Sequence, residues 1–67
     1  MTVRFVSLTH RNGRRVCALL PVALERRSHP LGDIDFEEAA LRFAIGEGLI
    51  GSRGEATAAV VARPSYF

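Results

Sequence analysis

VRFVSLTHRNGRRVCALL, residues 3–20, decides the fold of this 67-residue chain. Two runs rich in β-forming residues flank the dipeptide Asn12-Gly13. Asn-Gly between two such runs is the strongest short-range signal for a tight β-hairpin. We therefore predict that strands over residues 2–10 and 15–20 pair with each other.

The expected register of this hairpin follows from its loop. If the loop consists of Asn12 and Gly13 alone, Leu8 lies opposite Cys17 and Val6 lies opposite Leu19, which forms one compact aliphatic face. The other face also carries large apolar side chains, namely Val3, Phe5, Val16 and Leu20. Because neither face is cleanly polar, we expect both to be at least partly covered.

The rest of the chain predicts two helices and a third strand. A proline opens PVALERR, residues 21–27, and is typical of the first turn of a short helix. Asp35 followed by Glu38 fits a capping box, so a longer helix is expected over residues 36–45. TAAVVAR, residues 57–63, predicts the last strand. The expected fold is α+β, in the order ββααβ: a three-stranded antiparallel sheet, built from the N-terminal hairpin and the C-terminal strand, packed by one short and one longer helix.

The longer predicted helix carries two apolar stripes. Phe36, Ala40 and Phe43 line one side, which we expect to cover the sheet. The opposite stripe is the predicted partner-binding surface, and it consists of Ile34, Leu41, Ile45 and Leu49. Its neighbour could be the short helix of the same chain, an identical subunit or a foreign protein.

The glycines after this helix have the spacing of a nucleotide-binding loop. Gly46, Gly48 and Gly51 fit G-x-G-x-x-G. A dinucleotide site needs a strand before the glycines and a helix after them, and here the predicted order is reversed. We expect the glycines to end the helix and turn the chain into the last strand, and we expect no cofactor.

Composition limits the class of protein. A chain of this length forms a single domain, residues 1–67, with a small core, yet 48% of its residues are hydrophobic. Some apolar surface is therefore expected to face a protein partner or a second copy. The lone Cys17 excludes an intramolecular disulfide and a cysteine-built zinc site, and it favours a reducing cytoplasm. The longest apolar run, residues 16–24, is too short to span a membrane and is broken by a proline.

The sequence offers no set of residues typical of catalysis. His10 and His29 lack a second ligand at metal-binding spacing, so no metal site is expected. Ser28, His29 and Asp33 share a loop, which fits turn chemistry better than a catalytic triad. Cys17 fits a small core residue. We predict a protein without enzymatic activity and without a small-molecule substrate.

The basic residues form the second candidate site. All nine are arginine, and the net charge is +2. Arg11, Arg14 and Arg15 flank the hairpin turn, and Arg26 with Arg27 forms a second basic pair. Such arginines could contact nucleic-acid phosphates or an acidic protein surface, or they could only solvate the turn.

The order of these features resembles a family of small bacterial domains of unknown function. The shared features are V-x-F at Val3 and Phe5, GRRVC at residues 13–17, ALE at residues 23–25, DFEEA at residues 35–39, and a last strand followed by Phe67. The resemblance implies a hairpin followed by helices and a final strand. It implies no functional residue, because the family has no agreed activity.

The expected function is stoichiometric binding to another protein, as a small regulator or inhibitor. In this interpretation the exposed helix stripe docks the partner and the hairpin arginines guide it. Phage anti-CRISPR inhibitors are similar in size and layout. The alternatives are weakly specific nucleic-acid binding by the hairpin arginines and a structural homodimer.

Overall fold

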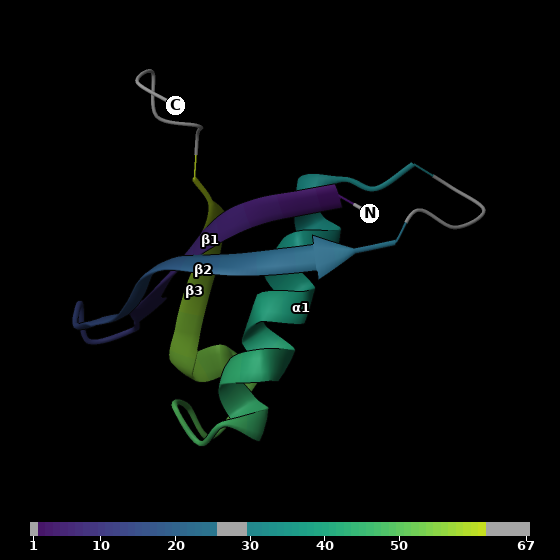
Figure 1. Ribbon diagram of the computed structural model, residues 1–67. Coiled ribbons are helices and arrows are strands. Elements are labelled where there is room, and N and C mark those ends of the chain that lie inside the picture. The colour runs from purple at the N-terminus through teal and green to yellow at the C-terminus, as the bar shows by residue number, and fades with distance from the viewer. Residues whose placement is uncertain (1, 26–29, 62–67) are drawn as a thin grey trace.

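The computed structural model describes residues 2–25 and 30–61 (Figure 1). Its sheet has the strand order β2-β1-β3, with both pairs antiparallel, and consists of β1 (Thr2–His10), β2 (Arg15–Leu24) and β3 (Ala56–Val60). Helix α1 (Asp33–Gly46) and a 3-10 turn (Arg53–Glu55) lie between β2 and β3. The α+β class and the three-stranded antiparallel sheet are confirmed, and the order in the described residues is ββαβ.

The predicted short helix over residues 21–27 is wrong in its described part. Residues 21–24 continue β2 as an edge strand, with Pro21 opposite Phe5. The carbonyl of Phe5 accepts a hydrogen bond from Val61 N–H at 2.8 Å, so Phe5 directs its polar backbone groups away from β2. The nitrogen of Pro21 therefore faces the free edge, where its missing N–H costs no hydrogen bond of the sheet. This placement is why proline continues the strand instead of opening a helix.

The hairpin is confirmed, but its loop is longer than expected. His10 N–H donates to Arg14 O at 2.7 Å, which leaves three residues, 11–13, in the loop. Gly13 has φ +89°, a conformation that glycine adopts at little cost and that is typical of three-residue hairpin loops. The side-chain oxygen of Asn12 accepts from Arg14 N–H at 2.8 Å and fixes the turn.

Two irregularities in the β1–β2 pairing then set the register. Leu8 pairs with Cys17 as predicted, because a shift between Leu8 and Thr9 compensates for the longer loop. A second shift places Leu20 opposite Val6, so the predicted pairing of Val6 with Leu19 is wrong by one residue. Without this second shift, Pro21 would lie opposite Arg4 and would have to supply an N–H to the β1–β2 pairing.

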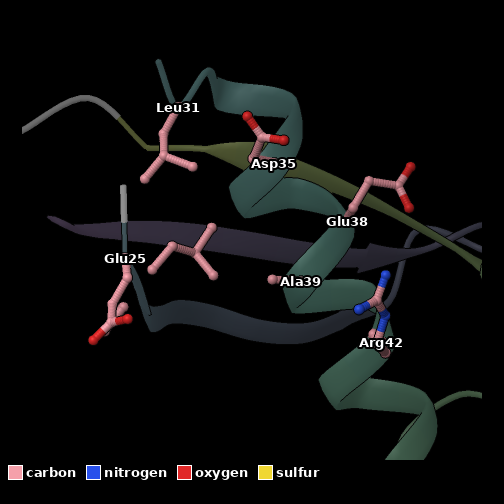
Figure 2. Close-up of a pocket in the computed structure, with 8 residues that line it drawn as sticks. Glu25, Leu31, Asp35, Glu38, Ala39 and Arg42 are labelled. Carbon is pink, nitrogen blue, oxygen red and sulfur yellow. The ribbon is translucent and has the colours of Figure 1, made fainter. Parts of the chain in front are cut away.

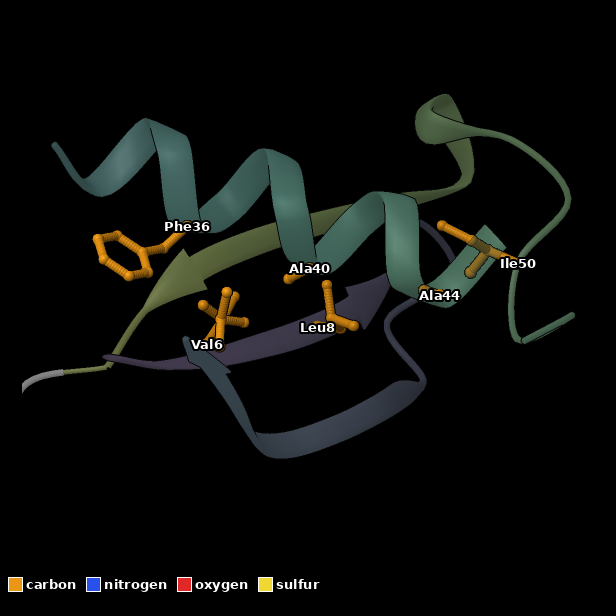
Figure 3. Close-up of a cluster of buried hydrophobic side chains, with 7 residues drawn as sticks. Val6, Leu8, Phe36, Ala40, Ala44 and Ile50 are labelled. Atoms are coloured by element: carbon orange, nitrogen blue, oxygen red, sulfur yellow. The ribbon is translucent and has the colours of Figure 1, made fainter. Parts of the chain in front are cut away.

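One face of the sheet packs against the helix (Figure 3). Val6 and Leu8 of β1 are fully buried beneath a row of α1 side chains spaced four residues apart. That row consists of Phe36, Ala40 and Ala44, and Val22 and Ile50 complete the core. The burial of Phe36 and Ala40 is confirmed.

The predicted inward position of Phe43 is wrong, since this side chain is 47% exposed and Ala44 is buried instead. The reason is geometric. An i, i+4 row is inclined to the helix axis, and the contact with the sheet follows this row through position 44.

The helix begins three residues earlier than predicted. Gly32, in an extended conformation, is the N-cap, and its N–H donates to Asp35 Oδ2 at 2.8 Å. Asp35 therefore occupies the third helical position, the role that the sequence pattern had given to Glu38. Glu38 instead forms an ion pair with Arg53.

The glycines after α1 end the helix, as expected. Gly46 is its last residue and Gly48 has φ +75°. Leu49 N–H donates to Ala44 O at 2.9 Å, which closes the helix end. The last strand, β3 (Ala56–Val60), confirms residues 57–60 of the predicted range; Val61 follows the strand, and residues 62–63 lie outside the described residues.

The difference between the two phenylalanines of α1 gives a stability test. Phe36→Ala removes a fully buried ring, so it should lower the free energy of unfolding by about 3 to 5 kcal/mol. The total for a chain of this size is roughly 3 to 10 kcal/mol, so this variant should lose a large part of its stability. The matched change Phe43→Ala should cost under about 1 kcal/mol. Urea unfolding followed by circular dichroism measures both, and equal losses would contradict the described orientation of α1.

The helix end gives a second test. Gly48→Ala should lower the free energy of unfolding by about 1 kcal/mol or more, because alanine is strained at φ +75°. Gly46→Ala is the control, since the added methyl group meets no atom within 4 Å and φ is not positive. It should leave stability unchanged or raise it by about 0.5 kcal/mol. Thermal unfolding of the two variants distinguishes these outcomes, and the reverse order would contradict the described cap.

Candidate binding surface

The side of the sheet that faces away from α1 is apolar and is covered by no described element (Figure 1). Side chains alternate along a strand, so the neighbours of the buried Val6 and Leu8 point to this side. We call it the open sheet face. It consists of Val3, Phe5, Ser7 and Thr9 of β1, Leu19, Pro21 and Ala23 of β2, Thr57 and Ala59 of β3, and Val61.

Large side chains on this face are exposed. Val3 is 54% exposed, Leu19 is 50% exposed and Phe5 is 37% exposed. Among the described residues, the strands carry one charged side chain on this side, Arg15, which lies opposite Thr9 at the hairpin end. An uncharged three-stranded surface with exposed aromatic and aliphatic side chains is typical of a docking surface.

The polarity of β1 is the reverse of the usual one. Arg4 alternates with Phe5 and lies on the helix side, where its guanidinium carbon is 5.4 Å from the centroid of the Phe36 ring. A one-sided antiparallel sheet normally directs polar residues to the uncovered side. Here the charge lies beside the helix and the aromatic ring of Phe5 lies on the uncovered side.

The predicted partner-binding stripe on α1 is partly exposed. Ile34 is 65% exposed, Leu49 is 49% exposed and Ile45 is 36% exposed, whereas Leu41 is half-buried against the core. The ion pair between Glu38 and Arg53 lies across the middle of this stripe. The stripe is therefore less continuous than the open sheet face.

The structure brings part of the two predicted sets together. A cleft of about 430 Å³ at the hairpin tip is lined by His10, Asn12, Arg14, Arg15, Val16, Gly48 and Leu49. Arg14 and Arg15 therefore border the same hollow as Leu49 of the predicted stripe. We call this hollow the hairpin-tip cleft.

Two further groups shape the hairpin tip. His10 is half-buried, and its Nε2 lies 3.8 Å from Glu55 Oε1. Arg11 is exposed, and its backbone N–H donates to Glu55 O at 2.8 Å. Arg26 and Arg27 lie outside the described residues, as do Ser28 and His29 of the rejected triad.

A second hollow lies between the end of β2 and α1 (Figure 2). It has a volume of about 490 Å³, and its polar groups are Glu25, Asp35, Glu38 and Arg42. Asp35 is engaged in the helix cap and Glu38 in its ion pair, so these carboxylates already have structural partners. Within residues 2–25 and 30–61, no cluster of three or more potential metal ligands occurs.

The chain matches no family model, no curated protein and no solved structure. The resemblance to a family of small bacterial domains therefore gains no support from these comparisons. In the described part of the chain, no helix is long and apolar enough to cross a membrane.

Sequence reasoning did not single out the open sheet face as the candidate surface. Its signal was present, because the predicted register placed Val3, Phe5 and Leu20 together on the face opposite Val6 and Leu8, and both faces were expected to be at least partly covered. The register shift in β2 then exchanged the roles of two leucines. Leu20 packs against the core and Leu19 is exposed.

Proposed function

We propose that this protein is a non-enzymatic binding module that docks an apolar protein surface on its open sheet face. The observation that supports the proposal is the exposure of Val3, Phe5 and Leu19 on a strand surface whose described residues carry no charged side chain except at the hairpin end. Burial of apolar surface contributes about 25 cal/mol per Å², so covering these exposed side chains would supply binding energy.

The hairpin arginines support this role from the end of the same sheet. Arg11, Arg14 and Arg15 are exposed around the turn, away from the apolar centre of the face. Charges at the rim of an interface mainly raise the association rate and select the partner's orientation. The module would thus combine an uncharged centre with a basic rim, and it would act by occupancy rather than by chemistry.

A photo-crosslinking experiment tests this proposal. Benzoylphenylalanine at position 5 should form a covalent adduct with the partner in cells, because the ring lies on the open sheet face. The matched control carries the same group at Ile34, which is more exposed but lies on α1. Mass spectrometry identifies the adducts. No adduct from position 5, or equal yields from both positions, would contradict the proposal.

The hairpin-tip cleft favours a second candidate function, which is weakly specific nucleic-acid binding. His10, Arg14 and Arg15 converge on one hollow, and a basic β-ribbon can contact phosphates on both sides of a groove.

Titration against duplex DNA at two salt concentrations tests this second function. Each phosphate contact contributes a slope of about −0.9 in the logarithm of the binding constant against the logarithm of salt concentration. Arg14→Ala with Arg15→Ala should therefore flatten the slope by about 2. Arg42→Ala, on exposed α1 surface, should leave it unchanged. Binding that does not depend on salt would exclude this function.

A further inference from the structure

We infer that the partner on the open sheet face is a second copy of this chain. The two copies are related by a two-fold axis that lies between the two sheets and runs perpendicular to β1. The inference rests on the proposed function, since it names the occupant of the same surface. Three properties of the face support it: the absence of charge from its centre, the distribution of large and small side chains, and its area.

The lack of charged side chains in the centre of the face determines how polar the partner surface can be. Among residues 2–25 and 30–61, the strands place no carboxylate or guanidinium on this face away from Arg15, so an occupant needs an equally uncharged and apolar surface there. This chain presents such a surface itself, with the same strand spacing. A symmetric two-fold contact uses one patch twice and requires only that the patch fit itself.

The face fits itself when the second copy is reversed. A two-fold axis perpendicular to β1, at the level of Val6, places Phe5 of one copy over Ser7 of the other. In the outer strands the same rotation places Leu19 over Pro21 and Val61 over Ala59. Each contact thus joins a larger side chain with a smaller one, and it occurs twice. Two twisted sheets can pack in this way about 10 Å apart.

The area of the face indicates a weak association. A strand of nine residues is about 30 Å long, and neighbouring strands are about 4.8 Å apart. With β3 shorter than the others, the flat outline is roughly 400 Å² per copy. Two copies then bury on the order of 800 to 1,000 Å², the lower end for specific interfaces. We expect a dissociation constant on the order of micromolar or weaker.

Pairing through the free edge of β2 is a less favourable route to a dimer. The nitrogen of Pro21 faces this edge and carries no N–H, so a strand added there would lose a hydrogen bond. Face-to-face packing does not need this donor.

Sedimentation velocity of the full chain, from about 1 to about 500 μM, tests the inference. The sedimentation coefficient should rise with concentration toward that of a dimer. Phe5→Glu should weaken the dimer about tenfold or more, because it places a charge in the apolar centre. Ala59→Arg is the second variant and should also weaken the dimer, because it places a charge at an exposed position on the open sheet face. Ile34→Glu, on α1, is the matched control and should dimerise normally.

Cysteine pairs test the orientation of the two copies. In a Cys17→Ala background, a bifunctional thiol reagent with a span of about 10 Å, the separation of packed sheets, should join a Phe5→Cys chain to a Ser7→Cys chain in preference to joining two identical chains. Predominance of the crosslinks between identical chains would overturn the perpendicular axis.

A monomer at every concentration, or a dimer broken by Ile34→Glu and not by Phe5→Glu, would overturn the inference. A foreign adduct from the photo-crosslinking group at position 5, with a monomeric chain, would overturn the inference while the proposed function stands. An adduct of two copies supports both, and no adduct contradicts both.

Discussion

The close contact between the Phe36, Ala40 and Ala44 row and the strand residues Val6 and Leu8 is the constraint on which the rest of the structure depends. Two alanines in the row allow the helix backbone to approach the sheet, and the ring of Phe36 fills the wider end (Figure 3). This contact buries seven residues completely or nearly so in the described chain. A single helix can cover one face of a sheet and no more. Within residues 2–25 and 30–61, no element therefore covers the second face.

A polar face could remain in contact with water without an unfavourable free energy. The open sheet face instead carries mainly apolar side chains. A short chain buries a smaller share of its surface than a long one, so some apolar exposure is expected in any protein of this size. Scattered exposure does not account for the present arrangement, because Arg4 lies on the helix side of β1 while Val3 and Phe5 lie on the other. Because side chains alternate along β1, the charged Arg4 lies on the side of the sheet that α1 already covers. An apolar surface placed on the open sheet face would remove these side chains from water, which is favourable.

Local signals in the sequence predicted the elements well, and non-local constraints account for the errors. The Asn12-Gly13 turn, the last strand and the burial of Phe36 and Ala40 follow from turn chemistry and periodicity, and the structure has them. The predicted helix at Pro21 is wrong because an edge strand accepts proline where the proline nitrogen faces away from the neighbouring strand. Pro21 meets this condition because it pairs with Phe5. The same shift exchanged Leu19 and Leu20, and no local pattern encodes it. The stripe with Ile34 and Leu41 was plausible from helical spacing alone, but the sequence could not show that the Glu38–Arg53 ion pair would interrupt it.

The two candidate surfaces are compatible because they occupy different parts of the same sheet. The hairpin-tip cleft lies beyond the end of β1, and the open sheet face lies over its middle. In a reversed pair of copies, the two hairpin tips point in opposite directions and keep Arg11 and Arg14 accessible, whereas Arg15, opposite Thr9, lies over Ala23 of the other copy at the edge of the contact. The chain extends over 33 Å in its longest direction, well beyond the screening length of about 8 Å at physiological salt, so repulsion between the tips is small. Dimerisation through the face would therefore double the number of basic tips without charge repulsion opposing it, and this is a physical reason for a weak dimer and a weak anionic contact to act together.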